Sequence, residues 1–397
     1  MPGTNGEQPT LPGREPLLRA LIDICGPDFA RTARSVDAVA GRRASFVAVP
    51  ATARSVADTM GLAEQRGLAV MPRGSGSKID WGAPPPGVDL IIDTGRLGGM
   101  WHHQPEELTA EVGVGTAVRA LQAALALHGQ RLAVDPPSPS ATVGGMLAVN
   151  ESGPLRHRFG APAEHVNRIS YVSSSGVAAE LDGDSGYPAI ANIDGVIMSA
   201  NLRLQPLPAA RRWVGVAVST PMQVHNLVEE ALAQDLELGG IEVDLPTPAI
   251  ARTTAQPPGS VAVLLEGDPV EVQERAERLG RALDEAATVS AIAPVWWGRY
   301  PFGRRDVALR ISVRIADLHA AVYALADAAG GAIPVRGSAG LGTVHAVLPG
   351  SLDPDRIERI VDSVRNVLMA RGGRAVIISA PPEIARYVDM ADRQDLF

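Results

Sequence analysis

A glycine- and serine-rich loop near residue 75 is the strongest local signal for chemistry in this 397-residue sequence. The stretch MPRGSGSK follows an apolar run, and its main-chain N–H groups are not obstructed by bulky side chains. Such amides converge on anions, and one charge-assisted hydrogen bond to a diphosphate is worth about 1.5–3 kcal/mol. The candidate binding residues are Pro72, Arg73, Gly74, Ser75, Gly76, Ser77 and Lys78. Because the loop matches neither common nucleotide-binding motif, an ordinary glycine-rich turn is the competing interpretation.

A second glycine-rich segment, PPSPSATVGGMLAVNESGP, runs from Pro136 to Pro154. Two glycine turns flank a short apolar stretch, an arrangement that lets the backbone pass close along an extended ligand. An irregular crossover that binds nothing is the alternative. The candidate binding residues in this segment are Pro137, Thr142, Val143, Gly144, Gly145, Ser152 and Gly153.

Two shorter features follow the second glycine segment. The basic stretch RHRFG, which begins at Arg156, either adds positive charge to the same site or forms a solvated surface turn. Further on, a turn leads into an apolar strand, and there Gly195 and Ile197 are the candidate ligand contacts. Taken alone, the stretch around Gly195 and Ile197 indicates only a turn followed by a strand.

The remaining reactive side chains do not form a recognisable site. Cys25 is the single cysteine, so the chain carries neither an internal disulfide nor an iron–sulfur cluster of its own. His102 and His103 are neighbours and point to opposite faces of a strand, while His345 alone in an apolar strand favours a core or edge histidine. We therefore expect no metal site, and no catalytic residue is identifiable. The formal net charge of −8 argues against nucleic acid as a partner.

The elements that must position these residues change character along the chain. A strand over 46–49, a helix over 55–66 and a strand over 68–71 lead directly into the first glycine loop. Beyond Pro208, strands and helices alternate, which predicts an α+β layer with helices on one face of a sheet. In this second half we expect strands over 214–218, 260–266, 307–313, 343–348 and 375–378, and helices over 222–233, 269–285, 316–329 and 354–370.

These patterns divide the chain into three parts. Residues 1–30 form a tail and a short helix, residues 31–208 the ligand-binding domain, and residues 209–397 the α+β domain. The start lacks a signal peptide, and no apolar run reaches the roughly 18–20 residues that span a bilayer. We therefore expect a cytoplasmic protein that is not inserted in a membrane and that reaches one only through a partner.

In their order and spacing, the four features resemble the FAD-binding domain of the vanillyl-alcohol-oxidase type, or PCMH-type, flavoproteins. Within that family the sequence is most similar to the FAD-binding E-type subunits of bacterial glycolate oxidases, and the similarity extends over about residues 45–380. Besides ATVGGMLA and SGP, it includes WWGRYPF from Trp296 and GSAGLGTVHAVLP from Gly337. The resemblance implies a two-subdomain PCMH-type FAD-binding domain followed by a C-terminal α+β, cap-like domain.

The resemblance also implies roles for the candidate residues. The first loop would hold the FAD diphosphate, and the second segment would line the flavin and its ribityl chain. Gly195 and Ile197 would lie near the adenine and ribose. Members with covalent flavin often carry a histidine in the first loop, and this sequence has none there, so we expect non-covalent FAD.

The function that the resemblance implies is an FAD-dependent oxidoreductase component acting on a small 2-hydroxy acid such as glycolate or lactate. Its partners would be a catalytic flavoprotein subunit and an iron–sulfur subunit. A carboxylate substrate needs a cation near the flavin, and the candidates are Arg156, Arg304 and Arg310.

Three departures from the family pattern support other readings. The segment between Leu181 and Gly195 is shorter than in the family, and the family's C-terminal tail is missing. The metal-binding histidine motif of the related D-type subunits is also missing. These departures favour a structural or assembly subunit that binds FAD weakly or not at all. A stand-alone oxidase of another alcohol or sugar acid is the third reading.

Overall fold

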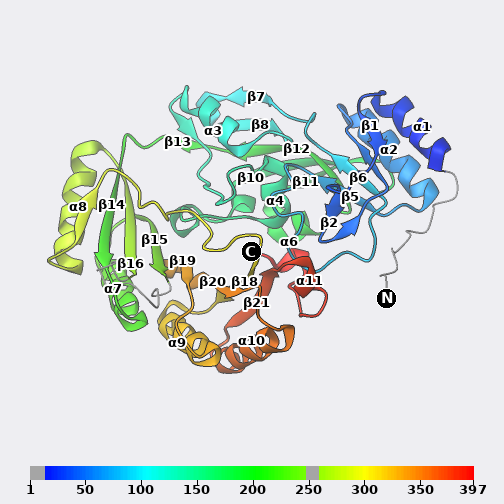
Figure 1. Ribbon diagram of the computed structural model, residues 1–397. Coiled ribbons are helices and arrows are strands. Elements are labelled where there is room, and N and C mark those ends of the chain that lie inside the picture. Colours follow the sequence, from blue (N-terminus) through cyan, green and yellow to red (C-terminus); the bar gives the residue numbers. More distant parts are fainter. Residues whose placement is uncertain (1–13, 247–258) are drawn as a thin grey trace.

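The computed structural model describes residues 14–246 and 259–397. Its N-terminal part holds helix α1 and a small sheet in the order β1-β4-β6-β5, in which β4, β6 and β5 run parallel (Figure 1). Helix α2 connects β4 to β5; a capping box between Thr52 and Ser55 starts it, and Gly67 ends it in the left-handed conformation. The bounds are α1 Arg14–Cys25, β1 Ala30–Thr32, β4 Phe46–Ala48, α2 Ala53–Arg66, β5 Val70–Arg73 and β6 Leu90–Asp93, with the small hairpin β2 Ala38–Val39 and β3 Arg42–Arg43 beside them.

A second, antiparallel sheet follows in the order β11-β10-β12-β8-β7. Leu121 of α3 and Met146 of α4 pack with Ile169 and Leu202 in the buried core of this sheet. The bounds are β7 Met100–Gln104, β8 Thr109–Gly113, α3 Val118–Ala126, β9 Gln130–Arg131, α4 Val143–Val149, α5 Arg156–Phe159, β10 Val166–Ser173, β11 Ala178–Asp182, α6 Gly186–Ala191, β12 Gly195–Arg203 and β13 Gln205–Pro206.

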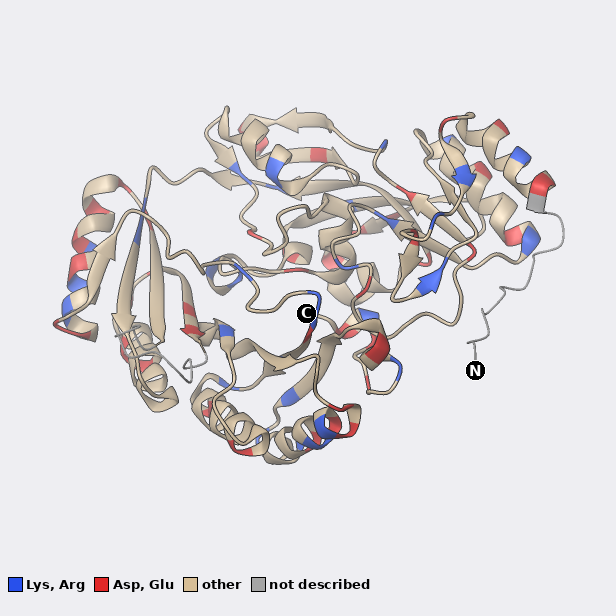
Figure 2. Ribbon diagram, in the orientation of Figure 1, with Lys and Arg blue, Asp and Glu red and all other residues tan. Residues whose placement is uncertain are grey.

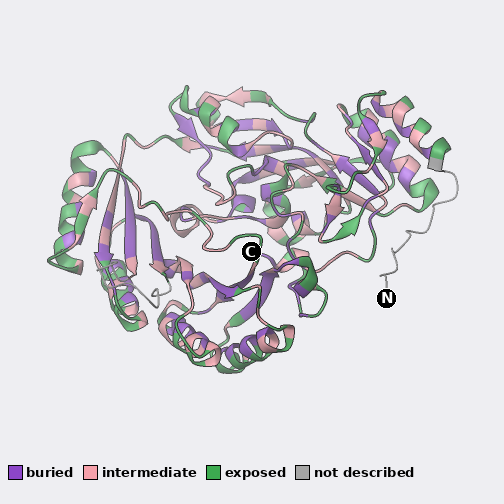
Figure 3. Cartoon of the chain, viewed as in Figure 1, coloured by how far each residue is buried: buried purple, intermediate pink, exposed green. Residues whose placement is uncertain are grey.

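The C-terminal half is built on one antiparallel sheet of eight strands in the order β17-β14-β16-β15-β19-β20-β18-β21. Helices α7, α8, α9 and α10 cover its outer face, and the other face is turned toward the N-terminal half (Figure 1). The strands are buried between these two layers, while the helices expose their outer sides (Figure 3). The bounds are β14 Ala210–Ala217, α7 Pro221–Ala233, β15 Leu238–Leu245, β16 Ser260–Gly267, α8 Pro269–Leu283, β17 Thr288–Ser290, β18 Asp306–Ser312, α9 Leu318–Ala329, β19 Val335–Ser338, β20 Thr343–Pro349, α10 Pro354–Met369 and β21 Arg374–Ser379.

The α+β fold expected from the sequence is confirmed, but two elements that matter for the site were not anticipated. Strand β15 was missed because its sequence, LGGIEVDL, combines two glycines with acidic residues, which strands usually avoid. Helix α4 was read as a pair of turns because two glycines lie in its first turn, at about 1 kcal/mol each relative to alanine. Tertiary packing overrides both local preferences.

The last residues return from the large sheet to the N-terminal half. After α11 (Pro382–Ala385), the Arg393 guanidinium donates to the carbonyl oxygens of Ile79 at 2.8 Å and Ala83 at 3.3 Å. The amide of Ala83 in turn donates to the carbonyl of Ala391 at 2.8 Å. The C-terminal segment therefore joins the two halves just beyond the first glycine loop.

Charged residues are concentrated on the outer helices, where acidic and basic side chains alternate along α8 and α10 (Figure 2). None of the helices within residues 14–246 and 259–397 has both the length and the apolar character that crossing a bilayer requires.

Candidate functional site

The two glycine segments, far apart in the sequence, touch each other in the fold. Gly74 lies so close to Thr142 that a Cβ on Gly74 would be 2.1 Å from the Thr142 Oγ1 atom, so only glycine fits. Thr142 is also the N-cap of α4, and its hydroxyl accepts a hydrogen bond from the amide of Gly145 at 3.2 Å. The first loop and the start of α4 therefore form one surface.

Lys78 ties the same two segments together with its charge. Its ammonium group forms an ion pair with the carboxylate of Glu151 and donates to the Ser138 hydroxyl at 2.6 Å. Glu151 Oε1 also accepts from the Ser138 amide and from the Tyr300 hydroxyl, each at 3.0 Å. Burial lowers the pKa of Lys78, and the Glu151 charge opposes that shift. The positive charge of Lys78 is therefore already compensated inside the fold.

Arg73 is likewise engaged, at the base of the first loop. Its guanidinium pairs with Asp93 at 2.9 Å and with Asp37 at 3.1 Å. Hydrogen bonds from Arg31, from the Arg34 amide and from Arg73 hold the pKa of Asp37 well below its usual range. Arg73 thus anchors the loop to the strands beneath it.

The main-chain amides of the first loop are free. Within the described part of the chain, the N–H groups of residues 74–78 donate no hydrogen bond. Ser75 and Ser77 are exposed, and Gly76 has a φ of +74°, which favours glycine. In α4, by contrast, the amides of Val143 and Gly144 donate to main-chain carbonyls at 2.9 Å. The first loop is therefore where these residues fit an FAD diphosphate.

Several of the predicted glycines are required by internal packing. A Cβ on Gly144 would lie 2.7 Å from Val114, one on Gly153 would lie 2.0 Å from the Asp135 carbonyl, and one on Gly195 would lie 2.1 Å from the Val172 carbonyl. Gly145 differs. It is exposed, and a Cβ there would meet only the Thr142 hydroxyl, at 3.2 Å. Gly145 therefore faces open space beside the first loop.

Gly195 and Ile197 lie apart from the cavity described next. Both are on β12, where Gly195 pairs with Ser173 and Ile197 with Tyr171 of β10. Neither lines the cavity. The structure brings the first loop and the second segment together, whereas these two residues stay on the sheet behind α4.

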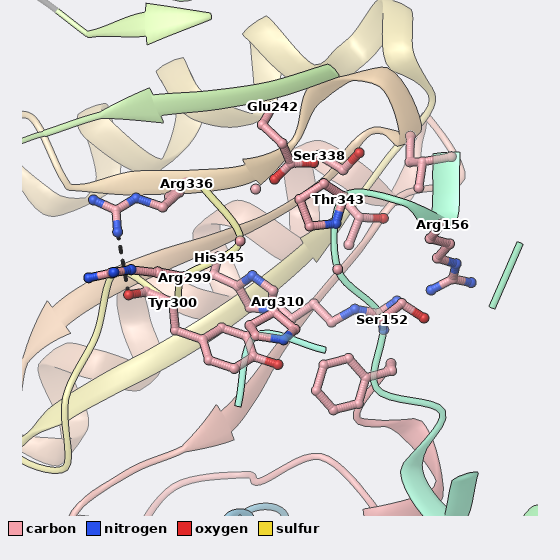
Figure 4. A pocket seen from close by; sticks show the side chains of 17 residues that line it. Ser152, Arg156, Glu242, Arg299, Tyr300, Arg310, Arg336, Ser338, Thr343 and His345 are labelled. Carbon is pink, nitrogen blue, oxygen red and sulfur yellow. Dashed lines mark hydrogen bonds between the residues drawn. The ribbon is translucent and has the colours of Figure 1, made fainter. Parts of the chain in front are cut away.

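A cavity of about 60 Å³ lies where the second segment meets the inner face of the large sheet. Figure 4 shows side chains from both halves pointing toward it. The N-terminal half contributes Pro137, Ser152, Gly153 and Arg156, and the C-terminal half contributes Glu242, Tyr300, Arg310, Ser338, Thr343 and His345. On the far side of Pro137, Gly298 and Arg299, a wider groove of about 770 Å³ opens toward solvent.

Arg156 and Arg310 are the cations of this cavity. Neither forms an ion pair with any residue in the described ranges, and the Arg310 Nε atom is buried without a hydrogen-bond partner. Burial, together with the nearby charge of Arg156, lowers the pKa of Arg310 to about 10, so it stays protonated at neutral pH. Two uncompensated guanidinium groups facing one cavity favour an anionic ligand. Arg304, the third candidate, is exposed and does not line the cavity.

Sequence reasoning missed several polar residues of the cavity and its rim, namely Glu151, Glu242 and Tyr300. The sequence held a signal for Glu242, because an acidic residue between Ile241 and Val243 interrupts an apolar stretch. His345 was expected to be a core or edge histidine, and it lies half-buried against the cavity. Burial lowers its pKa to about 3, so its imidazole is neutral at physiological pH.

Comparison with known proteins finds similarity in both sequence and fold. Residues 44–182 match the FAD binding domain family. A D-lactate dehydrogenase from Archaeoglobus fulgidus is 25% identical over 235 residues, covering 56% of this chain and 53% of that protein. The glycolate oxidase subunit GlcE of Escherichia coli is 28% identical over 182 residues, covering 43% and 51%. The chain thus aligns with about half the length of each of these curated relatives.

The fold extends the likeness beyond the matched domain. The structure of p-cresol methylhydroxylase with bound substrate superposes with a TM-score of 0.69 at 12% identity, over 95% of this chain and 92% of that one. The expected PCMH-type architecture is therefore confirmed along nearly the whole chain. Residues 44–182 are therefore similar to FAD-binding domains, the chain as a whole has the PCMH-type fold, and FAD is the cofactor that the free amides of residues 74–78 fit.

Proposed function

We propose that this chain is the FAD-binding component of an enzyme that oxidises small 2-hydroxy acids such as glycolate or lactate. The observation that carries the proposal is the pair of uncompensated guanidinium groups, Arg156 and Arg310, in a cavity bordered by the second glycine segment. The names of two relatives, a D-lactate dehydrogenase and a glycolate oxidase subunit, support this substrate class. Both substrates are 2-hydroxy acids, which carry a carboxylate next to the alcohol carbon.

The chain has one site for the cofactor and another for the substrate. The free amides of residues 74–78 bind the diphosphate of FAD, without a covalent link because no histidine lies in that loop. Arg156 and Arg310 hold the substrate carboxylate and orient the alcohol carbon. FAD, when bound, supplies the hydride-accepting chemistry. In domain terms, residues 31–208 provide the cofactor site and residues 209–397 close over it as a cap, after a tail and short helix in residues 1–30.

The partners belong to the same proposal. The similarity to GlcE supports a complex with a catalytic flavoprotein subunit and an iron–sulfur subunit, in which this chain has a substrate site of its own beside that of its partner. The complex lies in the cytoplasm or is attached to a membrane through a partner. Co-purification of tagged chain from its own cells tests this. An isolated monomer with full turnover of its own contradicts the subunit proposal.

The flavin content of purified protein tests the cofactor assignment. We expect a yellow protein that releases its flavin on heating or acidification, as a non-covalent cofactor does. A colourless preparation that remains colourless after incubation with FAD would leave only a scaffold subunit. That second candidate is favoured by the ion pairs of Arg73 and Lys78, which leave the first loop without an unpaired side-chain cation for a diphosphate.

Replacing Arg310 with methionine should raise the KM for the hydroxy acid by about 10- to 150-fold, because one charge-assisted hydrogen bond of about 1.5–3 kcal/mol is lost. Flavin content should not change, since Arg310 lies on the large sheet and not in the first loop. Steady-state kinetics with glycolate and lactate measure the effect. Arg304→Met, at an exposed arginine outside the cavity, is the matched control and should leave KM unchanged. Equal KM values for the two variants would remove Arg310 from the substrate site.

A further inference from the structure

Glu242 is a carboxyl group on the inner face of the large sheet with no visible structural purpose. It lies on the central strand β15 and is only 6% exposed. Its Oε1 atom is buried and has no hydrogen-bond partner among the described residues. In Figure 4 its side chain points into the cavity beside Ser338, which pairs with it across β15 and β19. An acid placed there lines the same hollow as Arg156 and Arg310.

Such a placement is unfavourable for folding. Burying a polar atom without a hydrogen-bond partner destabilises the fold, and burying an ionised carboxylate destabilises it more. The positions before and after Glu242 on β15, Ile241 and Val243, pack into the apolar core on the other side of the sheet. An apolar residue at position 242 would therefore suit the strand, and a carboxyl group facing the cavity is more readily explained by a ligand.

We propose that Glu242 is the proton acceptor for the hydroxyl group of the substrate. The inference rests on the 2-hydroxy acid oxidation proposed above. In that step the hydrogen on the alcohol carbon leaves with its bonding electron pair and reduces FAD. The hydroxyl proton passes to Glu242 Oε1, and a C=O double bond forms in place of the O–H and C–H bonds. The 2-hydroxy acid is oxidised to a 2-oxo acid.

The other titratable groups of the cavity are less suited to this role. The pKa of His345 is lowered to about 3 by burial, so it is a weak base. The Tyr300 hydroxyl already donates to Glu151, and burial raises its pKa well above its ordinary value. Burial raises the pKa of Glu242 to about 8; the neighbouring Ser338 hydroxyl opposes this shift, and the negative charge of Asp135 adds to it. A base whose pKa lies near the working pH is the most effective proton acceptor.

The pH dependence of the reaction follows from that pKa. Only ionised Glu242 can take a proton, so kcat/KM should rise with pH up to about 8 and then level off. The groups that face Glu242 or its cavity and shape this profile come from several elements. They are Asp135, Arg156, His157, Asp244, Tyr300, Arg310, Arg336 and His345.

The first test is the flavin-loaded Glu242→Gln variant, which preserves size and removes the base. We expect kcat to fall by about 100- to 10,000-fold with little change in KM and none in flavin content. The rise of rate toward pH 8 should vanish, and Glu242→Asp should recover part of the activity. Glu229→Gln is the matched control, because Glu229 is an exposed acid on α7 that does not line the cavity. Wild-type turnover in Glu242→Gln would overturn the proposal.

A second readout does not depend on turnover. Burial also raises the pKa of Asp135 to about 8, so the readout is the difference between the infrared titrations of wild type and Glu242→Gln. That difference should show one buried carboxyl group that ionises near pH 8. Oxalate, which binds as an anion and cannot be oxidised, should raise that midpoint because its negative charge lies next to Glu242. If oxalate shifts the midpoint but no hydroxy acid is oxidised, the proposed reaction fails and Glu242 remains a ligand-facing acid. If hydroxy acids are oxidised but the band titrates near the ordinary glutamate pKa, the role of Glu242 is refuted and the reaction stands.

Discussion

Replacing Gly145 with tryptophan should give a folded protein that no longer retains FAD. Gly145 is exposed in the first turn of α4, and a Cβ there meets only the Thr142 hydroxyl within 4 Å. An indole at this position would extend into the open space beside Gly74, the first residue whose amide is free to bind the diphosphate. The ratio of flavin to protein absorbance in purified samples measures the loss, and circular dichroism confirms that the variant is folded.

Two further variants make this result specific. Gly145→Ala adds one methyl group beside the Thr142 hydroxyl and should keep most of the flavin. Gly331→Trp places the same indole on an exposed glycine of the large-sheet half, with nothing within 4 Å, and should keep all of it. Full flavin content in Gly145→Trp would show that FAD does not pass along the start of α4, and the cofactor site would have to be sought elsewhere.

The predictions for the first loop and the second segment rest on local patterns. The strand leading into the first loop, the glycine pair at residue 144 and the family resemblance all depend on residues close together in the chain. Local patterning also located most strands and helices of the second half, because apolar periodicity reports directly on which face of an element is buried. The cofactor follows from these local signals.

What the sequence did not predict depends on long-range contacts. Arg73 and Lys78 were expected to help bind a diphosphate, yet Asp37, Asp93 and Glu151 compensate both charges. No local pattern could pair Lys78 with an acid so far along the chain. Gly144, Gly153 and Gly195 were interpreted as ligand contacts, whereas each also has neighbouring backbone or side-chain atoms that leave no room for a Cβ. A glycine in a family motif therefore indicates that another atom lies close to its Cα, and that atom can belong to the protein as well as to a ligand.

The sequence also did not predict the ion pair that joins the two halves of the chain. Arg131 of β9 and Glu266 of β16 form two parallel hydrogen bonds of 2.6 Å each, with side chains only 7% and 2% exposed. Arg211 adds a third bond to Glu266 at 2.8 Å. Burial alone would raise the pKa of Glu266, but the hydrogen bonds and charges of Arg131 and Arg211 outweigh it and hold that pKa below its ordinary value. A buried pair of this kind fixes how the cap half sits on the cofactor half.

Replacing Arg131 with methionine should therefore lower the free energy of unfolding by about 3 kcal/mol, the low end of the range for one partner lost from a buried pair, because Arg211 still contacts Glu266. Urea unfolding followed by fluorescence measures it. Since the pKa of Glu266 is depressed, the stabilisation is present above the ordinary glutamate pKa and is lost as pH falls below it, so the difference between wild type and variant should shrink in acid.

The double variant Arg131→Met with Glu266→Leu separates charge burial from packing. If the loss in Arg131→Met comes from a buried carboxylate with too little compensation, removing that carboxylate should restore part of the stability. Arg54→Met is the control for an exposed ion pair, because it breaks the pair with Asp58 at 3.9 Å. It should change the free energy of unfolding by less than about 1 kcal/mol. Strictly additive losses in the double variant would mean that the two side chains stabilise the interface by shape alone, since a charge pair must show coupling when both members are removed.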